Sequence, residues 1–160
     1  MDSQVLDLPR EEVNVGDCCK ECADSLRPVL NSGVELTCEP SMSHLTVYAV
    51  HSWLKIVLTA LLDNAVKFTQ EGAIRVSCKE DRVHRLLRFV IEDTGIGIKP
   101  EDAGHVFERF YKADIFTKGS GLGLAIAGEI MEMVGGRVYL DDTYQGGCRF
   151  IIEWPLQDKA

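Results

Sequence analysis

The chain of 160 residues is long enough for one domain with a buried core, because roughly 150 residues bury about 70% of their surface on folding. Its composition, 46% hydrophobic and 26% charged, is typical of a globular protein and excludes a disordered one. The net charge of −8 argues against a general nucleic-acid binder, which would carry a basic face.

The sequence also predicts the cellular location of the chain. It contains no apolar run long enough to span a bilayer, and its start, MDSQVLDLPREE, lacks the regions of a signal peptide. We therefore expect a soluble, cytoplasmic domain that makes no direct membrane contact. Its cysteines are then most simply reduced thiols, because Cys18, Cys19 and Cys22 lack a second pair of zinc ligands.

The N-terminal part is predicted to form two short strands around a helix. Residues 11–17, EEVNVGD, favour a strand, and Asp17 is placed to cap a helix that runs toward Pro28. Gly33 then turns the chain into a second strand over residues 34–39, VELTCE.

The strongest predicted helix covers residues 51–68. Its apolar residues repeat at helical spacing: Leu54, Val57, Leu58, Leu61, Leu62, Ala65 and Phe68. Two β-rich runs follow, over residues 73–80 and 86–93, and the short connection DRVH between them suits a hairpin.

The C-terminal part is predicted to contain a short helix into residues 105–114 and a long helix that opens at residues 119–123 and stops at Gly135. Strands over residues 137–142 and 148–155 then flank the turn TYQGG. Together these elements predict an α/β two-layer sandwich, with a mixed, mostly antiparallel sheet covered on one face by about three helices.

The first candidate functional feature lies on the predicted helix 51–68. At 100° per residue, Ala60, Asn64 and Lys67 share one stripe, and Asp63 is expected to point away toward solvent. An amide oxygen can bind Mg²⁺ while a nearby ammonium meets phosphate. The alternative is a polar boundary around a core helix.

The second feature is FVIEDTGIGI, where an apolar strand delivers Asp93 into a turn that contains Gly95 and Gly97. A carboxylate in this position could accept a hydrogen bond from an exocyclic amine such as that of adenine. The alternative is an ordinary acidic turn. Asp-Thr-Gly also occurs in aspartic proteases, but those enzymes need a second such aspartate, which this chain lacks.

The third feature is KGSGLGLAI, in which alternating glycines precede an apolar helix. Open backbone N–H groups at a helix start form a phosphate site. The spacing differs from a P-loop, which needs Gly-Lys-Ser or Gly-Lys-Thr, and from the dinucleotide fingerprint, which needs a third glycine or alanine where Ile126 stands.

In this order the motifs resemble the ATP-binding domain of sensor histidine kinases, within the wider group of gyrase and MutL ATPases. LLDNAVKFT resembles the asparagine box, EDTGIGI the first glycine box, FERFYKAD the phenylalanine box and GSGLGLAI the second glycine box. The resemblance implies a Bergerat-like ATP-binding fold, with Mg²⁺ and ATP as cofactors.

The resemblance implies that Asn64 coordinates Mg²⁺, that Lys67 contacts phosphate, and that Asp93 reads the adenine amine. It makes the following residues ATP-binding: Asn64, Lys67, Phe68, Asp93, Gly95, Gly97, Ile98, Lys112, Lys118, Gly119, Ser120, Gly121, Leu122, Gly123 and Leu124. It further implies a mobile lid, short for the family, with packing or covering aromatics at Phe107, Phe110 and Phe116.

Two residues depart from the family pattern. Ala60 stands where sensor kinases usually carry another asparagine and where the hydrolytic relatives carry a glutamate that acts as general base. An alanine cannot deprotonate water, so the sequence disfavours a gyrase-type ATPase. Phe68 replaces a more frequent tyrosine, which removes only a hydroxyl.

The resemblance implies autophosphorylation of a histidine on a helical-hairpin domain. No segment here resembles that hairpin, so we expect the acceptor histidine to lie on a separate domain. We expect residues 1–12 to lead in from it, residues 13–157 to form a single kinase domain, and residues 158–160 to be a tail. The expected partners are the hairpin domain and a response regulator, within a sensor anchored in the inner membrane. The alternative is a regulatory nucleotide-binding module, either a degenerate kinase or anti-sigma-like.

Overall fold

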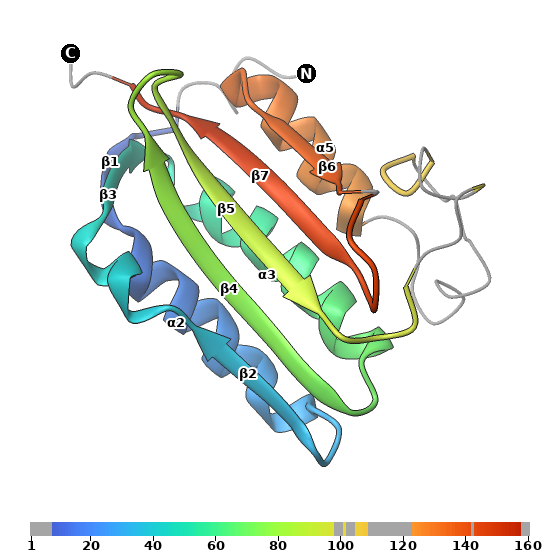
Figure 1. Cartoon of the computed structure of the whole chain (residues 1–160). Helices are drawn as coiled ribbons and strands as arrows, with labels where there is room; N and C mark the ends of the chain where they lie inside the picture. The colour runs from blue at the N-terminus through green and yellow to red at the C-terminus, as the bar shows by residue number, and fades with distance from the viewer. Residues whose placement is uncertain (1–7, 98–100, 102–104, 109–122, 142, 158–160) are drawn as a thin grey trace.

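Among the described residues, a five-stranded sheet forms one layer and three α-helices form the other (Figure 1). This computed structural model describes residues 8–97, 101, 105–108, 123–141 and 143–157. In spatial order the strands of the sheet are β2 (Val34–Cys38), β4 (Gly72–Asp81), β5 (Leu86–Asp93), β7 (Arg149–Pro155) and β6 (Arg137–Leu140). The helices are α2 (Val15–Leu26), α3 (His51–Phe68) and α5 (Gly123–Val134).

The direction of the strands confirms the predicted mixed sheet. β2 and β4 are parallel, whereas β4–β5, β5–β7 and β7–β6 are antiparallel. The predicted hairpin of β4 and β5 and the predicted C-terminal pair β6 and β7 are both present. All three helices lie on the same face of the sheet (Figure 1), so the α/β sandwich expected from the sequence is confirmed.

Helix α3 is the centre of the apolar layer. Six of the seven residues that the 3.6-residue repeat selects are buried, namely Leu54, Val57, Leu58, Leu61, Leu62 and Ala65, whereas Phe68 is half-buried. Trp53 and Val66, which the repeat did not select, are buried as well. The alternating residues of β5, Leu87, Phe89 and Ile91, face α3 from the sheet. The same alternation puts Asp93, the last residue of β5, on this buried face.

The N-terminal segment differs from the prediction in two respects. Asn14, not Asp17, caps α2, because its Oδ1 accepts the Asp17 backbone N–H at 2.9 Å. The sequence analysis also missed β3 (Thr46–Ala49), which pairs antiparallel with β1 (Glu11–Asn14) in a separate two-stranded sheet. Short 3₁₀ turns at Arg27–Val29 and Pro40–His44 complete this part.

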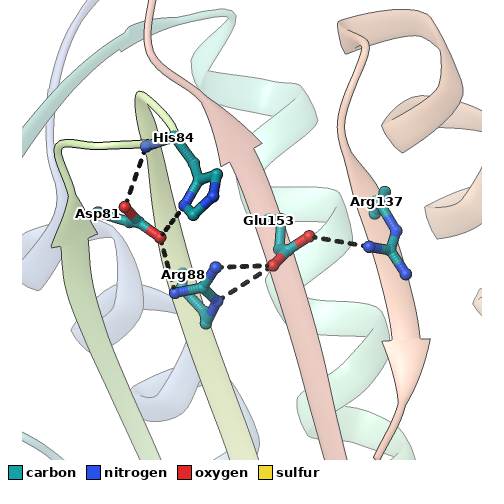
Figure 2. A network of polar contacts seen from close by, with 5 residues as sticks. All are labelled: Asp81, His84, Arg88, Arg137 and Glu153. Atoms are coloured by element: carbon teal, nitrogen blue, oxygen red, sulfur yellow. Dashed lines mark hydrogen bonds and ion pairs between the residues drawn. The ribbon is translucent and has the colours of Figure 1, made fainter.

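The face of the sheet that the helices leave uncovered carries ion pairs that cross the strands (Figure 2). Arg88 on β5 bonds Glu153 on β7 at 2.9 Å, and Glu153 also meets Arg137 on β6 at 3.5 Å. Asp81 accepts from Arg88 and from the backbone and ring of His84. This network lies toward the β4–β5 hairpin, at the opposite end of β5 from Asp93.

The described residues also bear on the predictions for cysteines, metal ligands and membrane spans. The described cysteines are free, and no group of three or more potential metal-ligating His, Cys, Asp or Glu side chains occurs among the residues that were placed. None of the described helices is long and apolar enough to cross a membrane. The predicted short helix into residues 105–114 and the opening of the helix at 119–122 lie largely outside the described residues.

Candidate nucleotide site

Asp93 is a buried carboxylate whose two oxygens have different surroundings. Its side chain ends β5 and is 4% exposed. Oδ1 accepts the backbone N–H of Gly95 at 2.8 Å and that of Cys148 at 3.2 Å. Within the described part of the chain, Oδ2 accepts no hydrogen bond, so it remains available to a ligand.

The electrostatics of Asp93 follow from this geometry. Burial raises the pKa of its carboxyl above the ordinary value, because the interior disfavours the charged form, while the two N–H bonds act in the opposite direction. Burial has the larger effect. A buried carboxylate with one free oxygen is a strong acceptor for a ligand N–H group.

Two glycines allow the backbone to close around Asp93. A Cβ on Gly95 would clash with the Phe68 carbonyl, and a Cβ on Gly147 would clash with the carbonyl of Asp93 itself. The Phe68 carbonyl also accepts the Ile96 N–H at 3.4 Å. The end of α3 and the turn after β5 are therefore in direct contact.

Asn64 lies on α3, one turn before that contact. Its side chain is half-buried, and no described residue forms a hydrogen bond with its amide. The amide oxygen can therefore serve as a single protein ligand to Mg²⁺, an ion that usually keeps several waters and phosphate oxygens in its coordination shell. The Asn64 side chain therefore fits a site for Mg²⁺.

Asp63 is partly exposed to solvent, as expected, but the expectation that it points away from the stripe that contains Lys67 is wrong. Asp63 Oδ2 lies 2.9 Å from Lys67 Nζ, and both side chains are about two-fifths exposed. Residues four apart on a helix are neighbours, since four steps of 100° return to within 40° of the start. Lys67 therefore has a carboxylate partner in this structure.

The start of α5 faces α3 near Ala60. A hollow of about 340 Å³ between the helices is lined by Lys55, Ile56, Thr59, Ala60, Gly123 and Ile126. Gly123 is exposed and Leu124 is buried. Ala60 contributes a methyl group to the lining of the hollow, and none of the lining residues named above carries a carboxylate.

Part of the predicted site lies outside the described residues: Ile98, Phe110, Lys112, Phe116, Lys118, Gly119, Ser120, Gly121 and Leu122. Phe107 is described, and its ring packs edge-on against Phe150 of β7, with centroids 5.8 Å apart. This contact ties the start of the phenylalanine box to the sheet. The role of Phe107 in a lid stays a prediction.

The sequence analysis missed the C-terminal side of the site. Gly147 and Cys148 hold Asp93, and the Tyr144 hydroxyl lies 3.4 Å from the Asp93 carbonyl oxygen. The pattern of the TYQGG turn predicts only a hairpin connection. Two adjacent glycines signal a close backbone approach as well as a turn, and that signal could have drawn attention to these residues.

The described five-stranded sheet with helices on one face forms an ATP-binding domain, in which the buried Asp93 carboxylate and the Asn64 amide are the candidate ligand contacts. Residues 49–158 match the family described as histidine kinase-, DNA gyrase B-, and HSP90-like ATPase. The chain belongs to this family, and within it corresponds to the catalytic ATPase domain of two-component sensor histidine kinases.

The similar proteins are longer sensors. The chain is 37% identical over 142 residues to autoinducer 2 sensor kinase/phosphatase LuxQ of Vibrio cholerae, which covers 82% of this chain and 16% of LuxQ. It is 38% identical over 121 residues to sensor histidine kinase YclK of Bacillus subtilis, covering 72% of this chain and 25% of YclK.

Solved structures agree with this assignment. Full-length ShkA in complex with AMPPNP superposes with a TM-score of 0.82 at 28% identity, over 96% of this chain and 32% of that chain. The mycobacterial sensor histidine kinase MprB gives 0.75 at 27% identity, over 94% of this chain and 99% of that chain.

Proposed function

We propose that this domain binds Mg-ATP and supplies the γ-phosphoryl group to a histidine on a separate helical-hairpin domain of the same sensor. The observation that carries the proposal is the Asp93 carboxylate, whose Oδ1 is held by two backbone N–H groups while Oδ2 accepts no hydrogen bond from any described residue. In this proposal Oδ2 accepts from the adenine amine, and Gly95 and Gly97 shape the pocket around the base.

At the phosphate end we assign Asn64 as the metal ligand and Lys67 as a phosphate contact. When bound, Mg²⁺ neutralises phosphate charge and aligns the transferring group. Lys67 must leave Asp63 to reach phosphate. An exposed pair at this spacing contributes only about 0.3–0.5 kcal/mol, which a charge-assisted bond to phosphate of about 1.5–3 kcal/mol exceeds.

The remaining predicted contacts complete the assignment. Phe68, Ile98 and Leu124 would line the pocket, Lys112 and Lys118 would meet phosphate, and the backbone from Gly119 to Gly123 would bind the phosphates and hinge the lid. Phosphoryl transfer depends mostly on positioning and electrostatics, which a nucleotide domain can provide without a general acid or general base of its own.

The acceptor of the phosphoryl group distinguishes this proposal from hydrolysis. Ala60 offers no base to activate water, so the γ-phosphoryl group is expected to pass to a partner histidine. We propose that a response regulator acts downstream and that the full-length sensor is membrane-anchored. The similarity to longer sensor kinases supports both parts.

The same Ala60 supports a second candidate function, a regulatory nucleotide-binding module without useful kinase activity. The missing second amide removes one possible oxygen ligand beside Asn64. The two candidates bind ATP alike and differ only in whether phosphate reaches a histidine.

Two experiments decide between these functions. A fluorescent ATP analogue is titrated with and without Mg²⁺ into wild type, Asn64→Ala and Asp93→Asn. Wild-type affinity in both variants would reject the site. The hairpin domain is then added and acid-labile phosphohistidine is measured. Tight binding with no label transfer supports the regulatory module, and substantial phosphate release by the domain alone supports an ATPase.

A further inference from the structure

The turn between β6 and β7 is fastened to the nucleotide site by a cluster of side chains on the outer face of the sheet. We propose that Arg149 and Tyr144 are positioning residues, which hold this turn against Asp93 and thereby set the preference for adenine over other bases. The inference rests on the proposed function, in which Asp93 reads the base.

The turn itself is closed by Asp141. Its Oδ1 accepts the Thr143 backbone N–H at 3.0 Å and the Thr143 hydroxyl at 2.6 Å. Its own N–H donates to the Arg149 carbonyl at 2.8 Å. Asp141 and Arg149 therefore form the base of the turn that contains Gly147.

Arg149 connects this base to the strand that delivers Asp93. Its Nε donates to Glu92 Oε2 at 2.9 Å, and its Nη1 lies 3.4 Å from Asp141 Oδ2. The guanidinium carbon also lies 4.3 Å from the centroid of the Tyr144 ring, in a cation–π arrangement. One side chain thus links β5, the start of the turn and the aromatic ring within it.

Tyr144 carries the connection to Asp93. Its hydroxyl donates to the Asp93 carbonyl at 3.4 Å, and the turn then returns through Gly147 to Cys148, whose N–H donates to Asp93 Oδ1. The Asp93 N–H completes the contact by donating to the Cys148 carbonyl at 2.9 Å.

The consequence concerns the direction of the carboxylate. Cys148 supplies one of the two N–H groups that fix Oδ1, and Oδ2 faces the ligand only while Oδ1 is fixed. If the turn moves away, Asp93 keeps the Gly95 N–H alone and can rotate. The site then loses part of its discrimination between an amine and a carbonyl on the base.

The sheet offers a matched control at its other end. Arg88 pairs with Glu153 and Asp81 on the same outer face (Figure 2). The side chains of Arg88 and Arg149 are 36% and 33% exposed, and each bonds a glutamate of a neighbouring strand at 2.9 Å. The two arginines differ in their distance from Asp93. A change in base preference that came from a general loss of sheet stability would therefore appear in the variants of both.

The test compares Arg149→Met, Tyr144→Leu and Arg88→Met in the whole chain. ATP and ITP, whose base carries a carbonyl in place of the amine, each displace a fluorescent ATP analogue, and urea unfolding reports stability. Complete loss of a charge-assisted hydrogen bond weakens binding by about 10- to 100-fold. Arg149→Met and Tyr144→Leu should weaken this hydrogen bond without removing it. We therefore expect them to lower the preference for ATP over ITP by about fivefold, less than the complete loss would.

Arg88→Met is expected to keep the wild-type preference at a similar loss of stability. Equal preferences in all three variants would overturn the inference, and so would a loss of preference in Arg88→Met. Tyr144→Leu keeps the test decisive if Arg149→Met fails to fold. Asp93→Asn distinguishes failure of the positioning role from failure of the proposed base contact. If only Asp93→Asn changes the preference for ATP over ITP, the positioning role is wrong and the base contact stands. If Asp93→Asn does not change the preference, the proposed base contact is wrong.

Discussion

The unequal surroundings of the two Asp93 oxygens predict the outcome of a single-atom replacement, Asp93→Asn. The amide oxygen must occupy the place of Oδ1, because an amide NH₂ there would face the N–H donors of Gly95 and Cys148. The NH₂ group is therefore forced into the place of Oδ2. A hydrogen-bond acceptor directed at the base becomes a donor.

This reversal has a predictable magnitude. Adenine loses a hydrogen bond to a charged acceptor, which contributes about 1.5–3 kcal/mol, or about 10- to 100-fold in affinity. Hypoxanthine, with a carbonyl in place of the amine, gains a donor. We therefore expect ATP to bind about 10- to 100-fold more weakly and ITP to bind at least as well as to wild type.

The fold should survive the change. The pKa of the Asp93 carboxyl is raised by burial, so the ionised side chain costs stability once the pH exceeds its ordinary range. Asparagine removes that cost with nearly the same shape. We expect a thermal midpoint at neutral pH no lower than that of wild type, which shows that any lost affinity is local.

Displacement of a fluorescent ATP analogue by ATP and by ITP measures both affinities, and differential scanning calorimetry measures the midpoint. Asp81→Asn, an exchange of the same kind at the other end of the sheet, is the control for binding. An unchanged ratio of ATP to ITP affinity in Asp93→Asn would refute the reasoning. Unfolding of the variant would refute the argument on stability.

Three further predictions follow from the packing. Gly147→Ala should displace the turn from Asp93, because its Cβ would clash with the Asp93 carbonyl, and we expect isothermal calorimetry to show ATP affinity reduced about tenfold or more. The pKa of Asp81 is lowered to about 2, chiefly by the backbone and ring of His84. Its stabilisation is thus complete above the ordinary pKa of about 3.9 and lost as the pH falls through the folded value, so urea unfolding should show Asp81→Asn less stable than wild type at pH 7, with a difference that shrinks steadily as the pH falls from about 4 toward 2. Leu58→Ala, at a fully buried position of α3, should lower the free energy of unfolding by about 2–5 kcal/mol in the same assay.

Local patterns explain how much of the fold could be predicted. The bounds of α3 agree with the predicted 51–68, because a long apolar repeat at helical spacing has few alternatives. The hairpin of β4 and β5 is equally clear in the sequence. β3 was missed because its four residues have no distinct period, and only its pairing with β1 makes it a strand.

The candidate site divides in the same way. Asn64, Asp93 and Gly95 belong to short motifs whose spacing is visible along the chain, so the order of residues is enough to propose them as ligands of a nucleotide. The order of the motifs identified the family, and the comparison with known proteins confirmed it.

The sequence by itself thus determined the kind of domain and its main helix, and it supplied the residues that we propose for its nucleotide site. Only the tertiary structure decided how Asp93 is held, because its partners Gly147 and Cys148 lie more than fifty residues away along the chain. It also placed Arg149 beside Glu92. Contacts between distant strands depend on register and on side-chain direction, which no local pattern contains.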